Sequence, residues 1–147
     1  MHSERDEICE LIYRYAERID AGDFDGVGAL LGGAELTFEA YDVVITGPDA
    51  VTALYAATTR RYEDGTPRTK HVMTNVIVEI DEDGKTASSR SYFTVLQAVP
   101  GEFALQPVVA GRYVDRFRRQ SDGWQFTAMH VSIDLMGDVS AHLLRDI

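Results

Sequence analysis

Three residues whose side chains can move protons lie in the first half of this 147-residue chain. Asp20 closes an amphipathic stretch, Tyr15 shortly precedes it, and His71 opens a strand-like stretch further along. An imidazole oriented by a carboxylate is a general base, and a nearby phenol can polarise or protonate an oxygen. Neither task needs a metal or a cofactor. The trio therefore predicts cofactor-free proton chemistry, provided that the fold brings the three groups together.

Each of these residues also has a purely structural interpretation. Asp20 could simply end its helix and cap the next segment, and His71 could be a surface residue beside Lys70 at the start of a strand. Tyr15 falls on an apolar stripe and could be a core aromatic residue with its hydroxyl satisfied inside the fold. The residues by themselves leave these alternatives open.

Three helices are expected in the N-terminal part of the chain. Apolar side chains recur with the helical period across residues 3–20 and form one buried stripe. Asp23 is a suitable N-cap for a second, shorter helix over residues 24–31. Pro48 follows a glycine turn and favours a third helix over residues 50–62.

The rest of the chain predicts strands. Two short strands are expected at residues 36–41 and 43–46. Long strands, separated by turns rich in Asp, Gly and Pro, are expected at residues 69–80, 86–98, 103–119 and 124–135. Long antiparallel strands twist and curl, so the predicted architecture is α+β, with a bent sheet that wraps around the helices and can leave a cavity. No linker or repeat divides the chain, which predicts one domain over residues 1–147.

The predicted strands also indicate which side chains face the cavity. Alternation places Met73 and Asn75 on the same face as His71. His130 alternates with Phe126 on the last strand, and could be a second pocket histidine or a core residue with a backbone partner. Aromatic residues on other strands can add apolar surface. The predicted pocket residues are Tyr41, Met73, Asn75, Tyr92 and His130.

Composition narrows the class of partner. Twenty-four acidic residues against fourteen basic ones give a net charge of -10, which argues against a nucleic-acid or anionic-membrane surface. The longest weakly apolar stretch, residues 50–57, is too short to span a bilayer, and the charged N-terminus lacks a signal peptide core. The single cysteine, Cys9, cannot form an internal disulfide. We therefore expect a cytoplasmic protein with no membrane partner.

Known catalytic and metal motifs are missing from the sequence. The spacings of Asp20, His71 and His130 include no short paired-ligand motif, so no metal is predicted. A glycine-rich phosphate loop, a nucleophile elbow and an HExxH motif are all absent, which disfavours nucleotide, acyl-transfer and zinc-peptidase chemistry.

Several short motifs, taken together, carry a family resemblance that covers nearly the whole chain. They are Glu7-x5-Tyr13 and Tyr15 running into Ile19-Asp20-Ala21-Gly22-Asp23-Phe24-Asp25, Gly47-Pro48-Asp49-Ala50, Lys70-His71-x3-Asn75, Gly111-Arg112-Tyr113-x-Asp115-x-Phe117, and Asp122-Gly123-Trp124-x-Phe126. In this order and spacing they resemble the SnoaL-like branch of the NTF2-like superfamily. The resemblance implies a cone of curved antiparallel sheet, closed by three N-terminal helices around a deep apolar pocket.

The chain is most similar to a subgroup that includes scytalone dehydratase, bile-acid 7α-dehydratase, hexachlorocyclohexane dehydrochlorinase and the β subunits of ring-hydroxylating dioxygenases. In its eliminating enzymes an Asp late in the first helix orients a His on the first long strand, and the His removes a proton from carbon. Asp20 and His71 match these positions, and Tyr15 matches an assisting tyrosine of the bile-acid enzyme.

The resemblance thus implies a dehydratase, lyase or isomerase that acts on a hydrophobic ring-bearing small molecule, in a homo-oligomer that is a dimer or a trimer. Two alternatives stay open. The chain could bind a small molecule without turnover, or it could be an accessory subunit similar to a dioxygenase β subunit.

Overall fold

The computed structural model describes residues 3–144 of the chain, with three helices and six strands in this part. The elements, in chain order, are α1 (Glu4–Asp20), α2 (Phe24–Leu30), β1 (Glu35–Phe38), β2 (Tyr41–Thr46), α3 (Pro48–Thr58), β3 (Thr69–Ile80), β4 (Thr86–Val99), β5 (Phe103–Gln120) and β6 (Gly123–Met136). The predicted helices and strands are all present. The main difference in bounds is at α3, which was predicted over residues 50–62. It begins at Pro48 and ends at Thr58, four residues before the predicted end.

Local chemistry explains the bounds of α1. The Ser3 side chain accepts a hydrogen bond from the backbone N–H of Asp6, and the Asp6 carboxylate accepts one from the backbone N–H of Ser3, which makes a capping box. The helix ends before Gly22, which has a φ of 73° and lies so close to Gly65 that a Cβ would be 1.9 Å from its carbonyl oxygen. The chain therefore turns at this position in a way that only glycine allows.

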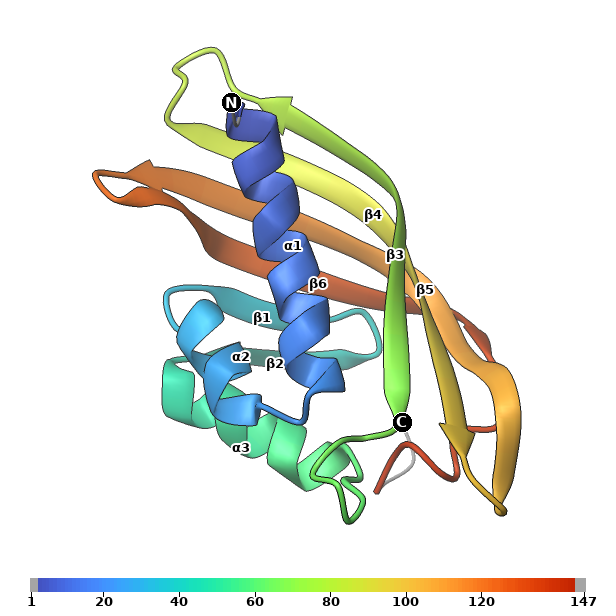
Figure 1. Cartoon of the computed structure of the whole chain (residues 1–147). Helices are drawn as coiled ribbons and strands as arrows, with labels where there is room; N and C mark the ends of the chain where they lie inside the picture. The colour runs from blue at the N-terminus through green and yellow to red at the C-terminus, as the bar shows by residue number, and fades with distance from the viewer. Residues whose placement is uncertain (1–2, 145–147) are drawn as a thin grey trace.

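The six strands form one bent sheet in the order β2-β1-β6-β5-β4-β3. Neighbours are antiparallel except β1 and β6, which are parallel, so the sheet is mixed and not purely antiparallel as expected. α1 lies across the concave side of the sheet, and α2 and α3 lie together beside its β1–β2 end (Figure 1). This arrangement agrees with the predicted α+β cone.

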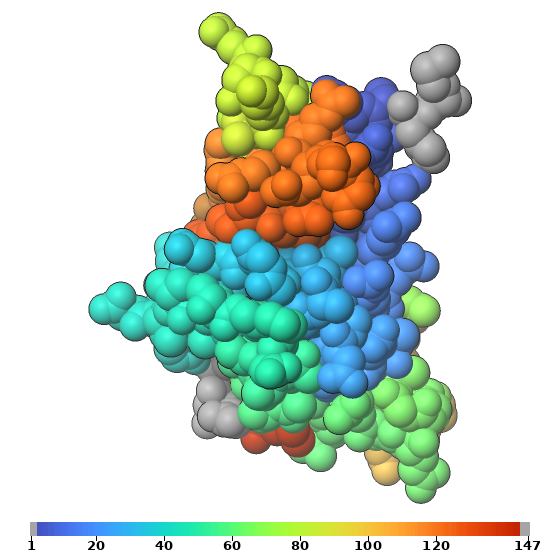
Figure 2. Space-filling view, turned by 90° about the vertical axis from the view of Figure 1, so that its left-hand side faces the viewer, coloured from blue at the N-terminus to red at the C-terminus, as the bar shows by residue number. Residues whose placement is uncertain are grey.

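The core fills the space between the helices and the concave face of the sheet. The buried stripe of α1 meets inward-facing side chains of β4, β5 and β6, including Phe93, Phe117 and Phe126. Figure 2 shows the helical side of the molecule, where the blue-to-green segments form a continuous face between the orange β5–β6 hairpin and the red C-terminal segment. The candidate active site lies at the end of α1 that is nearer this C-terminal segment.

Candidate active site

The carboxylate of Asp20 and the ring of His71 are in direct contact. Asp20 Oδ1 lies 2.7 Å from His71 Nδ1, and Asp20 Oδ2 accepts a hydrogen bond of 2.7 Å from the backbone N–H of His71. Thr69 Oγ1 donates a third hydrogen bond, of 2.8 Å, to Oδ1. The side chains of His71 and Asp20 are only 7% and 10% exposed. The last residue of α1 therefore anchors the beginning of β3.

These contacts decide between the interpretations of the pair that the sequence left open. Asp20 ends α1 but does not cap the next segment, since its carboxylate accepts hydrogen bonds from β3 and the N-cap of α2 is Asp23. His71 is not a surface residue, because its side chain is almost fully buried. Its Nδ1 is held by the carboxylate, and no described residue forms a hydrogen bond with Nε2. The second ring nitrogen is thus available to a ligand.

The electrostatics of the pair favour a charged carboxylate. Burial raises the pKa of Asp20, but the hydrogen bonds and charge of His71, together with the hydroxyl of Thr69, outweigh it, so that the pKa is lowered. An ionised Asp20 stabilises the imidazolium that forms when His71 takes up a proton, and it fixes the tautomer of the neutral ring with hydrogen on Nδ1. The arrangement has the properties of a general base.

A groove of about 550 Å³ runs along the seam between α1 and β3, and both members of the pair line it. It is open to solvent, whereas an enclosed pocket was expected. Of the predicted pocket residues, Met73 lines this groove. The complete lining consists of Tyr13, Ala16, Glu17, Asp20, Ala21, Thr66, Lys70, His71 and Met73.

Tyr15 belongs to a separate group of buried phenols. Its hydroxyl shares a hydrogen bond of 2.6 Å with that of Tyr55, and its ring packs edge-on against Tyr113 with centroids 5.5 Å apart. Burial raises the pKa of all three phenols well above 10, so they stay protonated. No described contact joins Tyr15 to Asp20 or His71, and its part in the chemistry stays a prediction.

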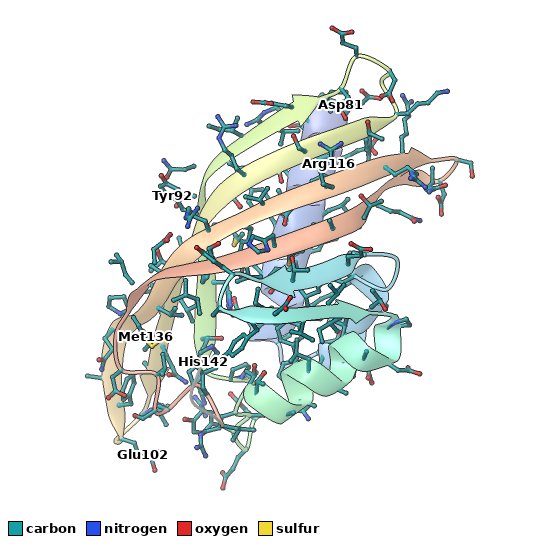
Figure 3. The ribbon with its side chains drawn as sticks, turned by 180° about the vertical axis from the view of Figure 1, so that it is seen from behind. Asp81, Tyr92, Glu102, Arg116, Met136 and His142 are labelled. Atoms are coloured by element: carbon teal, nitrogen blue, oxygen red, sulfur yellow. The ribbon has the colours of Figure 1, made fainter. Side chains whose placement is uncertain are left out.

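Tyr41 and Tyr92 do not line the groove. Tyr41 is 46% exposed on the edge strand β2, and Tyr92 is 52% exposed on the outer face of the sheet. Figure 3 shows Tyr92 projecting away from the strands. These two residues were expected in the pocket only because they are aromatic residues on strands, and residue type does not decide which face of a strand a side chain takes.

Two β-bulges change the positions of the other two predicted pocket residues, Asn75 and His130. Asn75 lies in a bulge of β3, with a φ of 52° and an exposed side chain. In β6, Thr127 is an extra residue that reverses the alternation, so Met129 takes the buried face. The expectation that His130 shares the face of Phe126 is therefore wrong. His130 lies on the opposite face, where its Nδ1 is 2.8 Å from Thr37 Oγ1.

Two residues near the pair were not found from the sequence. Thr69 is buried and holds Asp20, and strand alternation, which puts it on the face of His71, could have found it. His142 lies near the C-terminus, outside every motif of the sequence. The residue is 6% exposed, and the centroid of its ring lies 6.4 Å from that of His71. No local pattern in the sequence connects these two histidines.

Neither a clustered metal site nor a membrane-spanning helix is found within residues 3–144. In this part of the chain no three or more His, Cys, Asp or Glu side chains are grouped so that they could hold a metal ion. Over the same residues, no helix is both long enough and apolar enough to cross a membrane.

Comparison with models of known protein families identifies the family of this chain. Residues 2–130 match the model of the SnoaL-like domain, which is most of the chain. The chain belongs to the SnoaL-like family. No curated protein matches this SnoaL-like chain.

Solved structures with the same fold cover nearly all of this SnoaL-like protein. An NTF2-like protein with a cystatin-like fold from Novosphingobium aromaticivorans has a TM-score of 0.72 and 24% identity, over 94% of this chain and 86% of that chain. A proposed aromatic ring hydroxylase from the same organism has a TM-score of 0.70 and 23% identity, over 94% and 95%. A proposed scytalone dehydratase, also from that organism, has a TM-score of 0.71 and 18% identity, over 92% and 87%. These identities establish the fold alone.

Proposed function

We propose that this SnoaL-like protein is a cofactor-free lyase or isomerase, in which His71 removes a proton from a carbon of a hydrophobic, ring-bearing small molecule. The observation that carries the proposal is the 2.7 Å contact between Asp20 Oδ1 and His71 Nδ1 beside a groove. A proposed scytalone dehydratase and a proposed dehydratase from Streptomyces avermitilis among the proteins of similar fold agree with this chemistry.

The proposed reaction begins with the substrate in the groove and its acidic carbon against His71 Nε2. The C–H bond breaks, the proton passes to Nε2, and the charge of Asp20 stabilises the resulting imidazolium. In a dehydration the electron pair forms a double bond, the C–O bond breaks, and the departing hydroxide takes the proton from Nε2 and leaves as water. In an isomerisation the same proton returns to another carbon.

A proton-exchange assay with simple ketones tests this proposal and does not require the natural substrate. Cyclic ketones and hydroxyketones in D2O are followed by NMR for exchange at the acidic carbon, and by mass for the loss of water. We expect His71→Ala and Asp20→Asn each to lower turnover by about two to four orders of magnitude, as when an oriented base is lost. The matched control is His130→Ala, because that histidine lies on the other face of the sheet.

The outcomes separate the enzyme from the alternatives. Equal turnover in the wild type and in both variants of the pair would rule out His71 as the base. Tight ligand binding without exchange in the wild type would instead favour a small-molecule binding module. A need for a second polypeptide would favour an accessory subunit.

We also infer a homo-oligomer that associates through the outer face of the sheet. Val72, Tyr92 and Val114 are 40%, 52% and 46% exposed on this face, which supports an apolar contact surface there. Sedimentation of the wild type and of Tyr92→Lys would test the inference, with a smaller species expected for the variant.

A further inference from the structure

The segment after β6 returns to the end of the sheet where the Asp20–His71 pair lies. Residues 137–144 are fastened by backbone hydrogen bonds: Gly137 N–H to Val108 O at 2.8 Å, Arg60 N–H to His142 O at 2.8 Å, and Leu144 N–H to Thr58 O at 2.9 Å. Figure 3 shows His142 close to the end of β3 at which that strand begins. The segment thus places one specific side chain, His142, beside the pair.

Hydrogen bonds from side chains also hold residues 137–144 in place. The buried Gln97 donates from Nε2 to the carbonyl oxygen of Ala141 at 3.0 Å, and the hydroxyl of Tyr62 also donates to that oxygen. Leu143 forms a β-bridge with Thr59. Both neighbours of His142 are therefore fixed, and its position follows from the fold of residues 58–62 and 97, not from its own side chain.

The ring of His142 is buried and lacks a polar partner. It is 6% exposed, it packs edge-on against His71 with centroids 6.4 Å apart, and its Nδ1 is enclosed. No described residue forms a hydrogen bond with this nitrogen. Buried polar atoms in native proteins nearly always have partners, so an unpartnered imidazole beside a general base indicates a partner that arrives with the ligand.

The charge of the ring limits what this partner can be. The titratable groups that act on His142 are His71 and Asp20. Burial and His71 lower the pKa of His142 to about 4, against the opposing effect of Asp20. The ring is therefore neutral while the base works, with one N–H donor and one acceptor nitrogen. A neutral imidazole N–H suits an oxygen that gains negative charge during reaction, and it does not compete with His71 for the charge of Asp20.

We propose that His142 binds the carbonyl oxygen of the substrate and stabilises the enolate that forms when His71 removes the adjacent proton. The substrate class is thereby a ring ketone with a hydrogen on the carbon next to the carbonyl. The inference rests on the proposed function of His71. Its geometry is that of two imidazoles, one taking the proton through Nε2 and the other donating an N–H to the oxygen. Because Nδ1 is enclosed and both neighbours of His142 are held, the ring turns about its own side-chain bonds to receive the ligand.

The test uses 2-tetralone, a bicyclic ketone with acidic hydrogens next to its carbonyl, and the variants His142→Phe and His142→Gln. Phe keeps a planar ring without a donor, and Gln keeps an amide donor. The first readout is deuterium exchange at the acidic carbon, and the second is the infrared carbonyl frequency of the bound ketone. We expect His142→Phe to lower the exchange rate about a hundredfold, as for loss of one oxyanion donor, and to raise the carbonyl frequency, with partial recovery of both in His142→Gln.

The second readout keeps this inference separate from the proposed function. His71→Ala should abolish exchange yet leave the bound carbonyl frequency as in the wild type, since His142 is still present. A wild-type exchange rate in His71→Ala would refute the role of His71 as the base. The infrared carbonyl frequency would still test whether His142 binds the carbonyl oxygen. The inference about His142 is overturned by a wild-type rate in His142→Phe, by an unchanged carbonyl frequency in that variant, or by failure of the wild type to bind ring ketones. Thermal unfolding of His142→Gln shows whether a loss of exchange comes from a loss of the fold. The inference is also overturned if His142→Gln is folded but recovers neither the exchange rate nor the carbonyl frequency.

Discussion

Asp115 is a buried carboxyl group that makes the stability of the fold depend on pH. It is 0% exposed on the inner face of β5, where Ser89 Oγ donates a long hydrogen bond of 3.4 Å to Oδ2 and no described residue pairs with Oδ1. Burial raises the pKa of Asp115 from its usual 3.8 to about 8, and the hydrogen bond from Ser89 opposes this only in part. The folded protein therefore keeps this group protonated at neutral pH.

The sign and the magnitude of the pH effect follow from this difference. Between about pH 4 and pH 8 the folded state holds a proton on Asp115 that the unfolded state has released, so the free energy of unfolding falls as pH rises through this range. The slope for one proton is about 1.4 kcal/mol per pH unit. Across the whole range the loss amounts to roughly 5 kcal/mol as an order of magnitude.

The variant Asp115→Asn isolates this group, because the amide has the same shape and does not titrate. Urea unfolding followed by the fluorescence of Trp124, the only tryptophan, gives the free energy of unfolding at pH 5, 6, 7 and 8. We expect the value for the variant minus that for the wild type to rise by about 1.4 kcal/mol per pH unit. Asp134→Asn is the control. The hydrogen bond and charge of Arg112 lower the pKa of this exposed carboxyl, so its difference should stay flat above about pH 4. A flat difference for Asp115→Asn as well would refute the reasoning.

Three other substitutions test the site and its support. Thr69→Val removes one hydrogen bond to Asp20 and should therefore raise the pKa of that carboxyl, which an NMR titration of the Asp20 side chain would measure. Tyr15→Phe removes the buried hydrogen bond to α3 and should lower the free energy of unfolding by about 1 kcal/mol. It should also lower turnover about tenfold to a hundredfold if the phenol assists, whereas unchanged turnover would assign Tyr15 to the core. Gly22→Ala should lower the melting temperature, because its Cβ would lie 1.9 Å from the Gly65 carbonyl oxygen.

The elements of this fold could be predicted from the sequence because their signals are local. The bounds of β3 agree with the prediction at both ends, and the apolar stripe of α1 is the buried face of the observed helix. The contact of Asp20 with His71 is not local. It was expected from the order and spacing of the family motifs, and the structure contains it.

What the sequence could not reveal depends on small irregularities and on distant contacts. One extra residue at Thr127 reverses which side chains of β6 face inward, and nothing in the composition of that strand marks the bulge. The parallel pairing of β1 with β6 joins segments that are far apart in the chain. His142 lies beside His71 because residues 58–62, together with Gln97 and Val108, hold the C-terminal segment. Local periodicity contains no information about such pairings.

The pair also shows that one carboxylate serves both the fold and the proposed chemistry. Asp20 Oδ2 binds the backbone N–H of His71, while Oδ1 binds the ring of the same residue. The first contact ties the end of α1 to the beginning of β3, and the second sets the tautomer of the base. An amide oxygen can replace the carboxylate in the first contact, but an amide has no charge with which to stabilise an imidazolium. Asn at this position therefore preserves the tie between the elements and removes the charge. For this reason Asp20→Asn separates catalysis from folding more cleanly than truncation to Ala, which would remove both contacts together.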